Sequence, residues 1–197
     1  FRRLQNFEVR LSPGLTIIAG ANAAGKSTLL EAIYLLAIGK SARTPREREV
    51  INWQAAEERE HTIVDGTISC AEKDTRIIIG YRPSHTPLQY SQIGNLMDSP
   101  RSIRKTVNVE GIETNASDLL GLVRAVLFSA DDIDLVLGTP ATRRRYLNIL
   151  VCQMDASYLK ALQKYQRILL QRNRLLGLIR DGRAEELVRG GPEVYRR

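Results

Sequence analysis

The stretch that decides the fold is Gly20-Ala21-Asn22-Ala23-Ala24-Gly25-Lys26-Ser27, a full match to the phosphate-binding loop pattern. The apolar run at residues 15–19 precedes this loop and predicts a β-strand, and the helix-forming segment 28–38 follows it. A strand, a glycine-rich loop and a helix in this order are typical of a nucleoside triphosphate site. A glycine-rich turn that merely caps a helix would not need a strand before it. The sequence therefore predicts that the chain binds a nucleoside triphosphate.

Each position of the loop has a chemical reason. Glycine at positions 20 and 25 permits backbone conformations that let successive N–H groups face phosphate oxygens, and the following helix adds the positive end of its dipole. Lys26 is placed to reach the β- and γ-phosphates, and the Ser27 hydroxyl is a ligand for Mg²⁺. The predicted nucleotide contacts in the loop are Gly20, Ala21, Asn22, Ala23, Ala24, Gly25, Lys26, Ser27 and Thr28.

Composition indicates a globular chain with a sizeable core. The chain has 197 residues, of which 43% are hydrophobic, and it contains no apolar run of membrane-spanning length. The first residues lack the apolar core of a signal peptide, so we expect a cytoplasmic protein with no membrane partner. Its two cysteines, Cys70 and Cys152, are expected to be core residues rather than ligands or a disulfide.

The net charge of +7 is confined to the C-terminal part. Residues 140–197 hold 13 Lys and Arg against 5 Asp and Glu, whereas the first 139 residues hold 16 against 17. A basic face attracts nucleic acid phosphates, and a solvated helical arm explains the same composition equally well. Charge alone therefore leaves both alternatives open.

The first half of the chain reads as an α/β unit with an antiparallel β region. Weak alternation at residues 6–10 and the turn at 12–14 predict a hairpin leading into the strand at 15–19. Gly39 is the expected C-cap of the helix, and a polar loop follows at 40–45. Strands are predicted at 62–70, 75–81 and 106–109.

The second half becomes increasingly helical. Residues 117–120 predict a short helix, and residues 125–128 predict a buried strand. One helix is expected from Pro140 and a longer one from residues 155–157, with Gly182, Gly190, Gly191 and Pro192 interrupting the pattern. The longer helix has an apolar stripe that calls for a partner helix, formed by Tyr158, Leu162, Tyr165, Leu169, Leu176 and Ile179.

Several stretches together resemble the RecF family of bacterial recombination-mediator ATPases, which belong to the ABC class and are related to SMC proteins. The resemblance covers nearly the whole chain. Segments 1–2, 20–28, 30–34 and 39–44 follow the family's order and spacing, and a late block is more specific to it, formed by residues 126–136, 138–140, 143–147 and 171–176.

The resemblance implies an α/β fold with an ABC-type P-loop ATPase lobe and an antiparallel β subdomain, followed by the start of an α-helical lobe. Residues 1–139 would form the ATP-binding lobe, and residues 140–197 would begin a truncated helical lobe.

The chain departs from the family pattern at several places. Ala23 stands where the family usually has glycine, Arg3 where an asparagine is common, and Ser129-Ala130-Asp131-Asp132 where Ser-Pro-Glu-Asp is usual. The signature motif and the acidic Walker B strand of the family are expected after Arg197. We therefore expect this chain to bind nucleotide without efficient turnover, within a parent protein that is a slow ATPase.

The resemblance also implies a function and its residues. The parent would bind ATP with Mg²⁺, close as an ATP-gated homodimer on double-stranded or gapped DNA, and act in recombinational repair, replication and the SOS response with mediator proteins of the RecF pathway. Arg2 would lie near the nucleotide, and Arg43 would approach the γ-phosphate or DNA. Both arginines have the simpler alternative of a solvated surface charge.

Two further groups of residues are candidates. Asp131 or Asp132 occupies the place of the glutamine that senses Mg²⁺ and water in ABC proteins, although Asp132 is equally suited to cap a helix. Arg143, Arg144 and Arg145 are the candidate DNA contacts, with packing of the helical arm as the alternative.

Two other classes of protein compete with this interpretation. A small P-loop kinase would need an arginine-rich lid, whereas the loop helix here leads to an antiparallel β region and a helical arm. A transporter nucleotide-binding subunit would carry a glutamine after Phe128, where this chain has Ser129.

Overall fold

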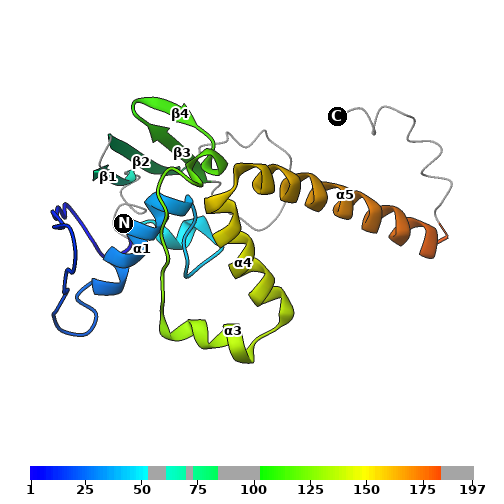
Figure 1. Ribbon diagram of the computed structural model, residues 1–197, viewed down its shortest axis with the longest axis horizontal. Coiled ribbons are helices and arrows are strands. Elements are labelled where there is room, and N and C mark those ends of the chain that lie inside the picture. The colour runs from blue at the N-terminus through cyan, green and yellow to red at the C-terminus, as the bar shows by residue number, and fades with distance from the viewer. Residues whose placement is uncertain (53–60, 70–72, 84–102, 183–197) are drawn as a thin grey trace, which may run out of the picture. The chain divides into compact units, whose positions relative to one another are not determined.

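The computed structural model describes residues 1–52, 61–69, 73–83 and 103–182. By their contacts the residues divide into two units, Phe1–Gln153 and Met154–Arg197, and each is considered by itself. This division lies one helix later than the change of pattern predicted at Pro140. Figure 1 shows the elements of both units.

The first unit contains one sheet of four antiparallel strands in the order β1-β2-β3-β4. The strands are β1 (Thr62–Ser69), β2 (Asp74–Pro83), β3 (Ile103–Val109) and β4 (Ile112–Thr114). Thr62 lies opposite Tyr81, and Ile77 lies opposite Val109. The predicted antiparallel region is confirmed, except that Cys70 lies outside the described residues.

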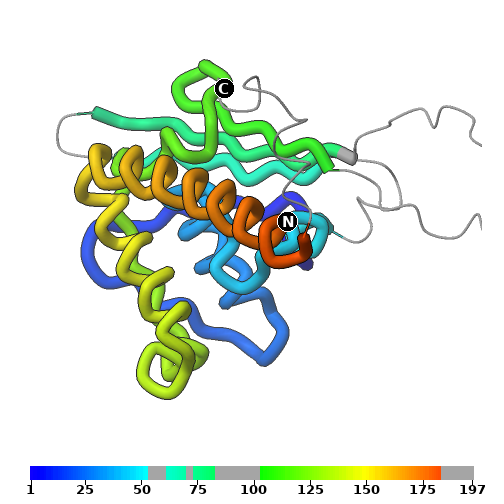
Figure 2. Tube along the Cα trace, turned by 90° about the vertical axis from the view of Figure 1, so that its right-hand side faces the viewer, coloured from blue at the N-terminus to red at the C-terminus, as the bar shows by residue number. Residues whose placement is uncertain are grey.

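Helix α1 (Lys26–Ile38) packs on this sheet and forms the core with it (Figure 2). Leu35 of α1 and Ile77 and Ile79 of β2 are completely buried, and a Cβ at Gly66 would come within 2.5 Å of the Leu36 side chain. The remaining buried apolar residues of this core are Phe1, Val50, Ile51, Val64, Tyr81, Val107 and Leu119. Packing against the sheet therefore fixes the direction of the helix that follows the loop.

Two interactions stabilise the C-terminal end of α1. Gly39 adopts a left-handed conformation with φ 74°, and its N–H donates to the carbonyl oxygen of Leu35 at 2.7 Å, which confirms the predicted C-cap. The Lys105 ammonium of β3 donates to the Gly39 carbonyl oxygen and pairs with Glu47 at 3.1 Å. A cation at a helix C-terminus is favoured by the helix dipole. Glu47 begins the short helix η1 (Glu47–Val50).

Three predicted strand segments are wrong. Residues 6–10, 15–19 and 125–128 form no strand, and Ile17 and Phe128 are 81% and 83% exposed. A strand forms only where a neighbour supplies hydrogen-bond partners, and the one sheet among the described residues does not extend to these segments. Instead, the Ala125 N–H donates to the Gln153 side chain at 2.7 Å.

Short helices connect the sheet to the helical part. They are η2 (Ala116–Leu119), which corresponds to the short helix predicted at 117–120, then η3 (Ala130–Ile133) and α3 (Asp134–Leu137). Helix α4 (Pro140–Met154) begins at Pro140 as predicted, because the missing N–H of proline costs nothing in the first turn.

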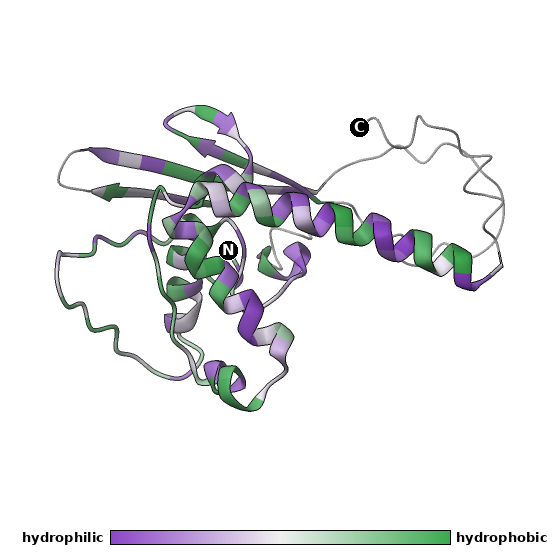
Figure 3. Ribbon diagram, turned by 45° about the vertical axis from the view of Figure 1, so that its right-hand side comes forward, coloured by the Kyte–Doolittle hydropathy of each residue, from purple (hydrophilic) through white to green (hydrophobic). Residues whose placement is uncertain are grey.

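Helix α5 (Ala156–Arg180) is the predicted longer helix, with the Asp155 side chain accepting a hydrogen bond from the Ser157 N–H at 2.7 Å. Hydrophobic and hydrophilic bands alternate along it in Figure 3, and none of its residues is buried. Gly190, Gly191 and Pro192 lie outside the described residues. No described helix is both long and apolar enough to span a membrane.

Candidate functional site

The glycine-rich loop turns directly into α1 at Gly25. Gly25 has φ 97° and ψ 5°, a left-handed conformation that favours glycine, and it occupies the N-cap position of the helix. A Cβ at this position would come within 2.9 Å of the Leu4 side chain. The left-handed backbone at position 25 therefore favours glycine, and any larger residue would also displace the end of the Leu4 side chain.

Ala23 also has a left-handed backbone, with φ 64°. This conformation brings the Cβ of an L-residue close to its own carbonyl group and costs roughly 1–2 kcal/mol. The strain explains in physical terms why glycine suits this position of the loop.

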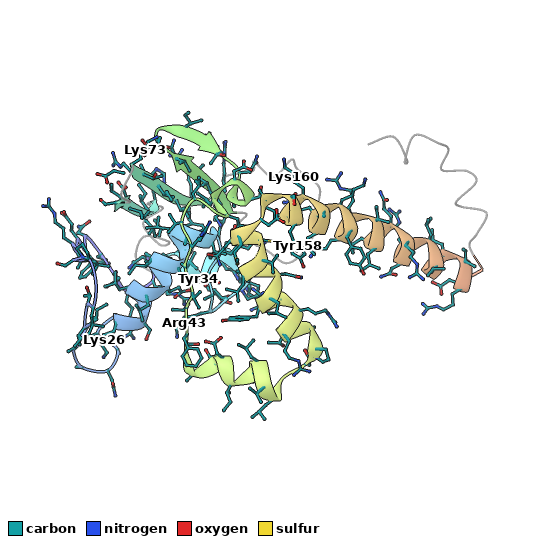
Figure 4. The ribbon with its side chains drawn as sticks, in the orientation of Figure 1. Lys26, Tyr34, Arg43, Lys73, Tyr158 and Lys160 are labelled. Carbon is teal, nitrogen blue, oxygen red and sulfur yellow. The ribbon has the colours of Figure 1, made fainter. Side chains whose placement is uncertain are left out.

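Lys26 folds back over the loop (Figure 4). Its Nζ donates to the carbonyl oxygens of Gly20 and Ala21, both at 2.7 Å. The Ser27 side chain, on the same first turn of α1, is exposed, whereas Thr28 is buried with 7% exposure. The loop thus gathers one ammonium and one accessible hydroxyl at the positive end of a helix, which suits a Mg²⁺-bound triphosphate.

The candidate Arg2 contacts the loop helix through Glu31 of α1, a residue that the sequence did not single out. Arg2 Nη2 donates to Glu31 Oε1 at 2.8 Å, and Arg2 Nε lies 2.7 Å from Oε2. The backbone of Arg2 is anchored as well, because its N–H donates to the Val50 carbonyl oxygen and its own carbonyl oxygen accepts from the Asn52 amide. Arg2 is therefore a fixed part of the structure rather than a free surface charge.

The candidate Arg43 lies at the same carboxylate. Its Nη1 is 3.9 Å from Glu31 Oε2, and its side chain is 50% exposed. Ser41, which contacts the same carboxylate, donates to Glu31 Oε1 at 2.5 Å. A charged residue within the otherwise apolar helix sequence of residues 28–38 is the signal that points to Glu31.

Asp132 and Asp131 differ in what they contact. The Asp132 carboxylate accepts from the Ser129 N–H at 2.5 Å, and the two residues form a capping box at the start of η3. This is the capping role considered as the alternative for Asp132. Asp131 lies next to it on the exposed side of the same short helix.

The three candidate DNA-binding arginines have different surroundings. Arg143 donates to the carbonyl oxygens of Leu135, Val136 and Gly138 at 3.2–3.4 Å, at the end of α3. Burial raises the pKa of Tyr34 of α1, and the positive charge of Arg145 nearby lowers it by a smaller amount. Arg144 is exposed. Consecutive residues point about 100° apart on a helix, so the three do not form one surface.

The described residues include no group of three or more His, Cys, Asp and Glu side chains arranged to hold a metal ion. In nucleotide sites, Mg²⁺ is instead held by one protein hydroxyl, by phosphate oxygens of the nucleotide and by water. Ser27 is the residue in this part of the chain that fits that role.

Comparisons with known proteins agree with this geometry. Residues 1–120 match the AAA domain family. The whole chain is 36% identical to a DNA replication and repair protein RecF of Herpetosiphon aurantiacus, of which it covers 53%, and 93% of the chain is 37% identical to RecF of Chloroflexus aurantiacus, of which it covers 45%.

A solved structure, described as that of the recombination mediator protein RecF-ATP in the RecFOR pathway, is similar with a TM-score of 0.72 and 31% identity. The similarity covers 89% of this chain and 43% of that one. The chain therefore spans about half the length of the relatives that it matches. The fold is that of an ABC-type ATPase lobe followed by helices, as predicted.

Proposed function

The chain belongs to the AAA domain family as a RecF-like member, and from this premise we propose that it is the ATP-binding part of an ATP-dependent DNA-binding protein of recombinational repair and replication. The observation that carries the proposal is the Lys26 ammonium, held over the loop by the Gly20 and Ala21 carbonyl oxygens at the start of α1. The family relationship favours this function over a P-loop kinase or a transporter subunit.

At the loop, phosphate oxygens of ATP compete with the two carbonyl oxygens for the Lys26 ammonium. A phosphate carries formal charge and a carbonyl does not, so the ammonium gains a charge-assisted hydrogen bond by the exchange. The backbone N–H groups of residues 20–27 then meet the phosphates, and the Ser27 hydroxyl binds Mg²⁺. Thr28 contributes through its N–H, since its side chain is buried.

The other predicted residues surround this loop in the proposal. Glu31 holds Arg2 and Arg43 beside α1, and from there the two arginines bring positive charge near the triphosphate. Asp131 is the better candidate for sensing Mg²⁺ and water, because Asp132 is engaged as a cap. Efficient hydrolysis requires further carboxylates that position water and the metal ion.

On the DNA side, we propose electrostatic binding of double-stranded or gapped DNA by an ATP-gated homodimer. The basic excess of residues 140–197 supports it, and Arg144 is one of the exposed side chains of this segment. The similar RecF-ATP structure is described as belonging to the RecFOR pathway, which supports mediator proteins of that pathway as the proposed partners. A cytoplasmic location and a part in the SOS response belong to the same proposal.

The proposal is tested on the full-length protein with fluorescently labelled gapped and intact duplexes. Fluorescence anisotropy reports DNA affinity, and sedimentation velocity reports the oligomeric state, each with Mg-ATP, with Mg-ADP and without nucleotide. We expect Mg-ATP to shift the protein to a dimer and to tighten DNA binding at least tenfold. The same affinity and the same sedimentation coefficient in all three conditions would contradict the proposal.

A further inference from the structure

Glu31 is a completely buried carboxylate in the middle of the loop helix. Burial of a charge is costly unless opposite charges and hydrogen bonds compensate it, and here the compensation comes from outside the helix. Arg2, Ser41 and Arg43 supply it from two separate segments of the chain. Three partners of this kind point to a role beyond packing.

The two arginines are held very unequally. Arg2 is 22% exposed and meets both oxygens of the carboxylate, at 2.8 Å and 2.7 Å, whereas Arg43 is 50% exposed and approaches only Oε2, at 3.9 Å. At Oε2 the geometry of the Arg2 Nε contact is too poor for a hydrogen bond, and among the described residues this oxygen has no other hydrogen-bond donor. Arg43 is thus attracted to an oxygen that it does not bind firmly.

The backbone around Arg43, by contrast, is fixed. The Ser41 hydroxyl that donates to Glu31 also accepts from the N–H groups of Arg43 and Thr44, at 3.1 Å and 3.2 Å. Glu31 therefore anchors the start of the Arg43 side chain through Ser41 while its guanidinium stays half in solvent. Such an arrangement allows the guanidinium to move without moving the loop.

Glu31 also lies about one helical turn after the end of the phosphate-binding loop. Glu31 follows Ser27 by four residues, so both lie on one row of α1, roughly 6 Å apart along the axis. Figure 4 shows Arg43 beside the helix that begins at Lys26. A guanidinium with a side chain of this length has the reach to exchange one anion for another over such a distance.

We propose that Glu31 is a positioning residue that fixes Arg2 and shares Arg43 with a bound triphosphate. Arg43 lies at the carboxylate until phosphate charge draws it away, and Arg2 stays. The inference rests on the proposed nucleotide site and adds a device that links nucleotide to the loop at residues 41–44. Because Arg43 gives up one anion when it gains another, its net contribution to ATP affinity is small in the unmodified protein.

A double-mutant cycle on the full-length protein tests the exchange. Mg-ATP affinity is measured for the unmodified protein, Arg43→Ala, Glu31→Gln and the double variant, with Asp65→Asn as a control that removes the carboxylate from the exposed Arg76–Asp65 pair. We expect Arg43→Ala to weaken affinity about three- to fivefold more in the Glu31→Gln background than in the unmodified and Asp65→Asn backgrounds, as befits a half-exposed ion pair.

General damage from Glu31→Gln, including any effect on Arg2, enters both arms of the cycle and leaves the ratio unchanged. The same effect of Arg43→Ala in every background overturns the inference. If Lys26→Ala in the same assay leaves Mg-ATP affinity unchanged, the proposed nucleotide site itself fails. A normal loss with Lys26→Ala and no coupling in the cycle refutes only the exchange.

A second measurement needs no substitution at the buried position. Phenylglyoxal modifies exposed guanidinium groups, and peptide mass spectrometry gives the modification rate of Arg43 relative to Arg76, which is paired with Asp65 at 2.6 Å. We expect Mg-ATP to slow the modification of Arg43 at least threefold and to leave Arg76 unchanged. An unchanged rate at Arg43 under saturating Mg-ATP overturns the inference.

Discussion

The Lys26 ammonium lies 2.7 Å from the carbonyl oxygen of Gly20, so the two ends of the phosphate-binding loop are joined by a hydrogen bond. The cation that the loop needs for phosphate is thereby held at the loop itself. A side chain already ordered at its site loses less conformational entropy when a ligand binds. The arrangement therefore favours binding as well as the integrity of the loop.

The left-handed backbone of Ala23 predicts a stabilising substitution. Ala23→Gly removes the strain of φ 64° but makes the unfolded chain more flexible, so we expect a net gain of about 0.5–1 kcal/mol in the free energy of unfolding. Ala24→Gly is the control and should lose about 0.4–1 kcal/mol, because no such strain is relieved there. Urea denaturation with an unchanged slope measures both. Equal losses in the two variants would show that Ala23 is not strained in solution.

The hydrogen bond between the Gln153 side chain and the Ala125 N–H predicts a destabilising substitution. Gln153 is only 5% exposed, and Gln153→Leu leaves the partly buried N–H without its partner. We expect the free energy of unfolding to fall by about 1–3 kcal/mol, measured by urea denaturation. Gln163→Leu at an exposed position of α5 is the control and should change it little. A similar effect of both variants would argue against this contact.

The different surroundings of the arginine cluster predict different effects on DNA binding. Arg144→Gln should reduce the slope of log affinity against log salt by about 0.9, the value for one phosphate contact on duplex DNA. Arg143→Gln should leave the slope unchanged, because this side chain is engaged at the end of α3. DNA titrations at several salt concentrations measure the slopes. Equal slopes for Arg144→Gln and the unmodified protein would show that Arg144 is a solvated surface charge that does not contact DNA.

The cap of α5 predicts a response to acid. Hydrogen bonds from Ser157 hold the pKa of Asp155 below its ordinary value of about 3.9. The resulting stabilisation is complete above that value and is lost as the pH falls through the lower pKa of the folded state. Asp155→Asn keeps a good cap at neutral pH but does not titrate, so it should show a smaller loss of thermal stability between about pH 6 and about pH 2.5. An identical loss in both proteins would contradict this origin.

The strands and helices that the sequence predicts correctly are those with a local signal. Residues 62–69 and 74–83 show the alternation of half-buried strands, and Pro140 and Asp155 mark helix starts by their own chemistry. The three-residue strand β4 is too short to show alternation, although Glu110 and Gly111 before it both have positive φ, as a tight hairpin turn requires.

The errors lie where structure depends on distant partners. Residues 15–19 and 125–128 have the composition of strands, but the backbone partners that define a strand are absent from the described sheet. The site shows the same distinction. Lys26 is recognisable from eight consecutive residues, whereas the partner of Glu31 is Arg2, which is 29 residues away in the sequence and meets it only in the folded chain.

Binding of Mg-ATP by Lys26→Ala tests the central claim most directly. Calorimetry on the full-length protein compares it with Lys73→Ala, which removes an exposed lysine at the sheet, and circular dichroism checks that both variants are folded. We predict that Lys26→Ala weakens Mg-ATP binding by about 100-fold or more, as the loss of charge-assisted hydrogen bonds to phosphate requires, and that Lys73→Ala binds normally. Equal, unweakened affinity in the two variants would contradict the assignment of residues 20–27 as the phosphate-binding site.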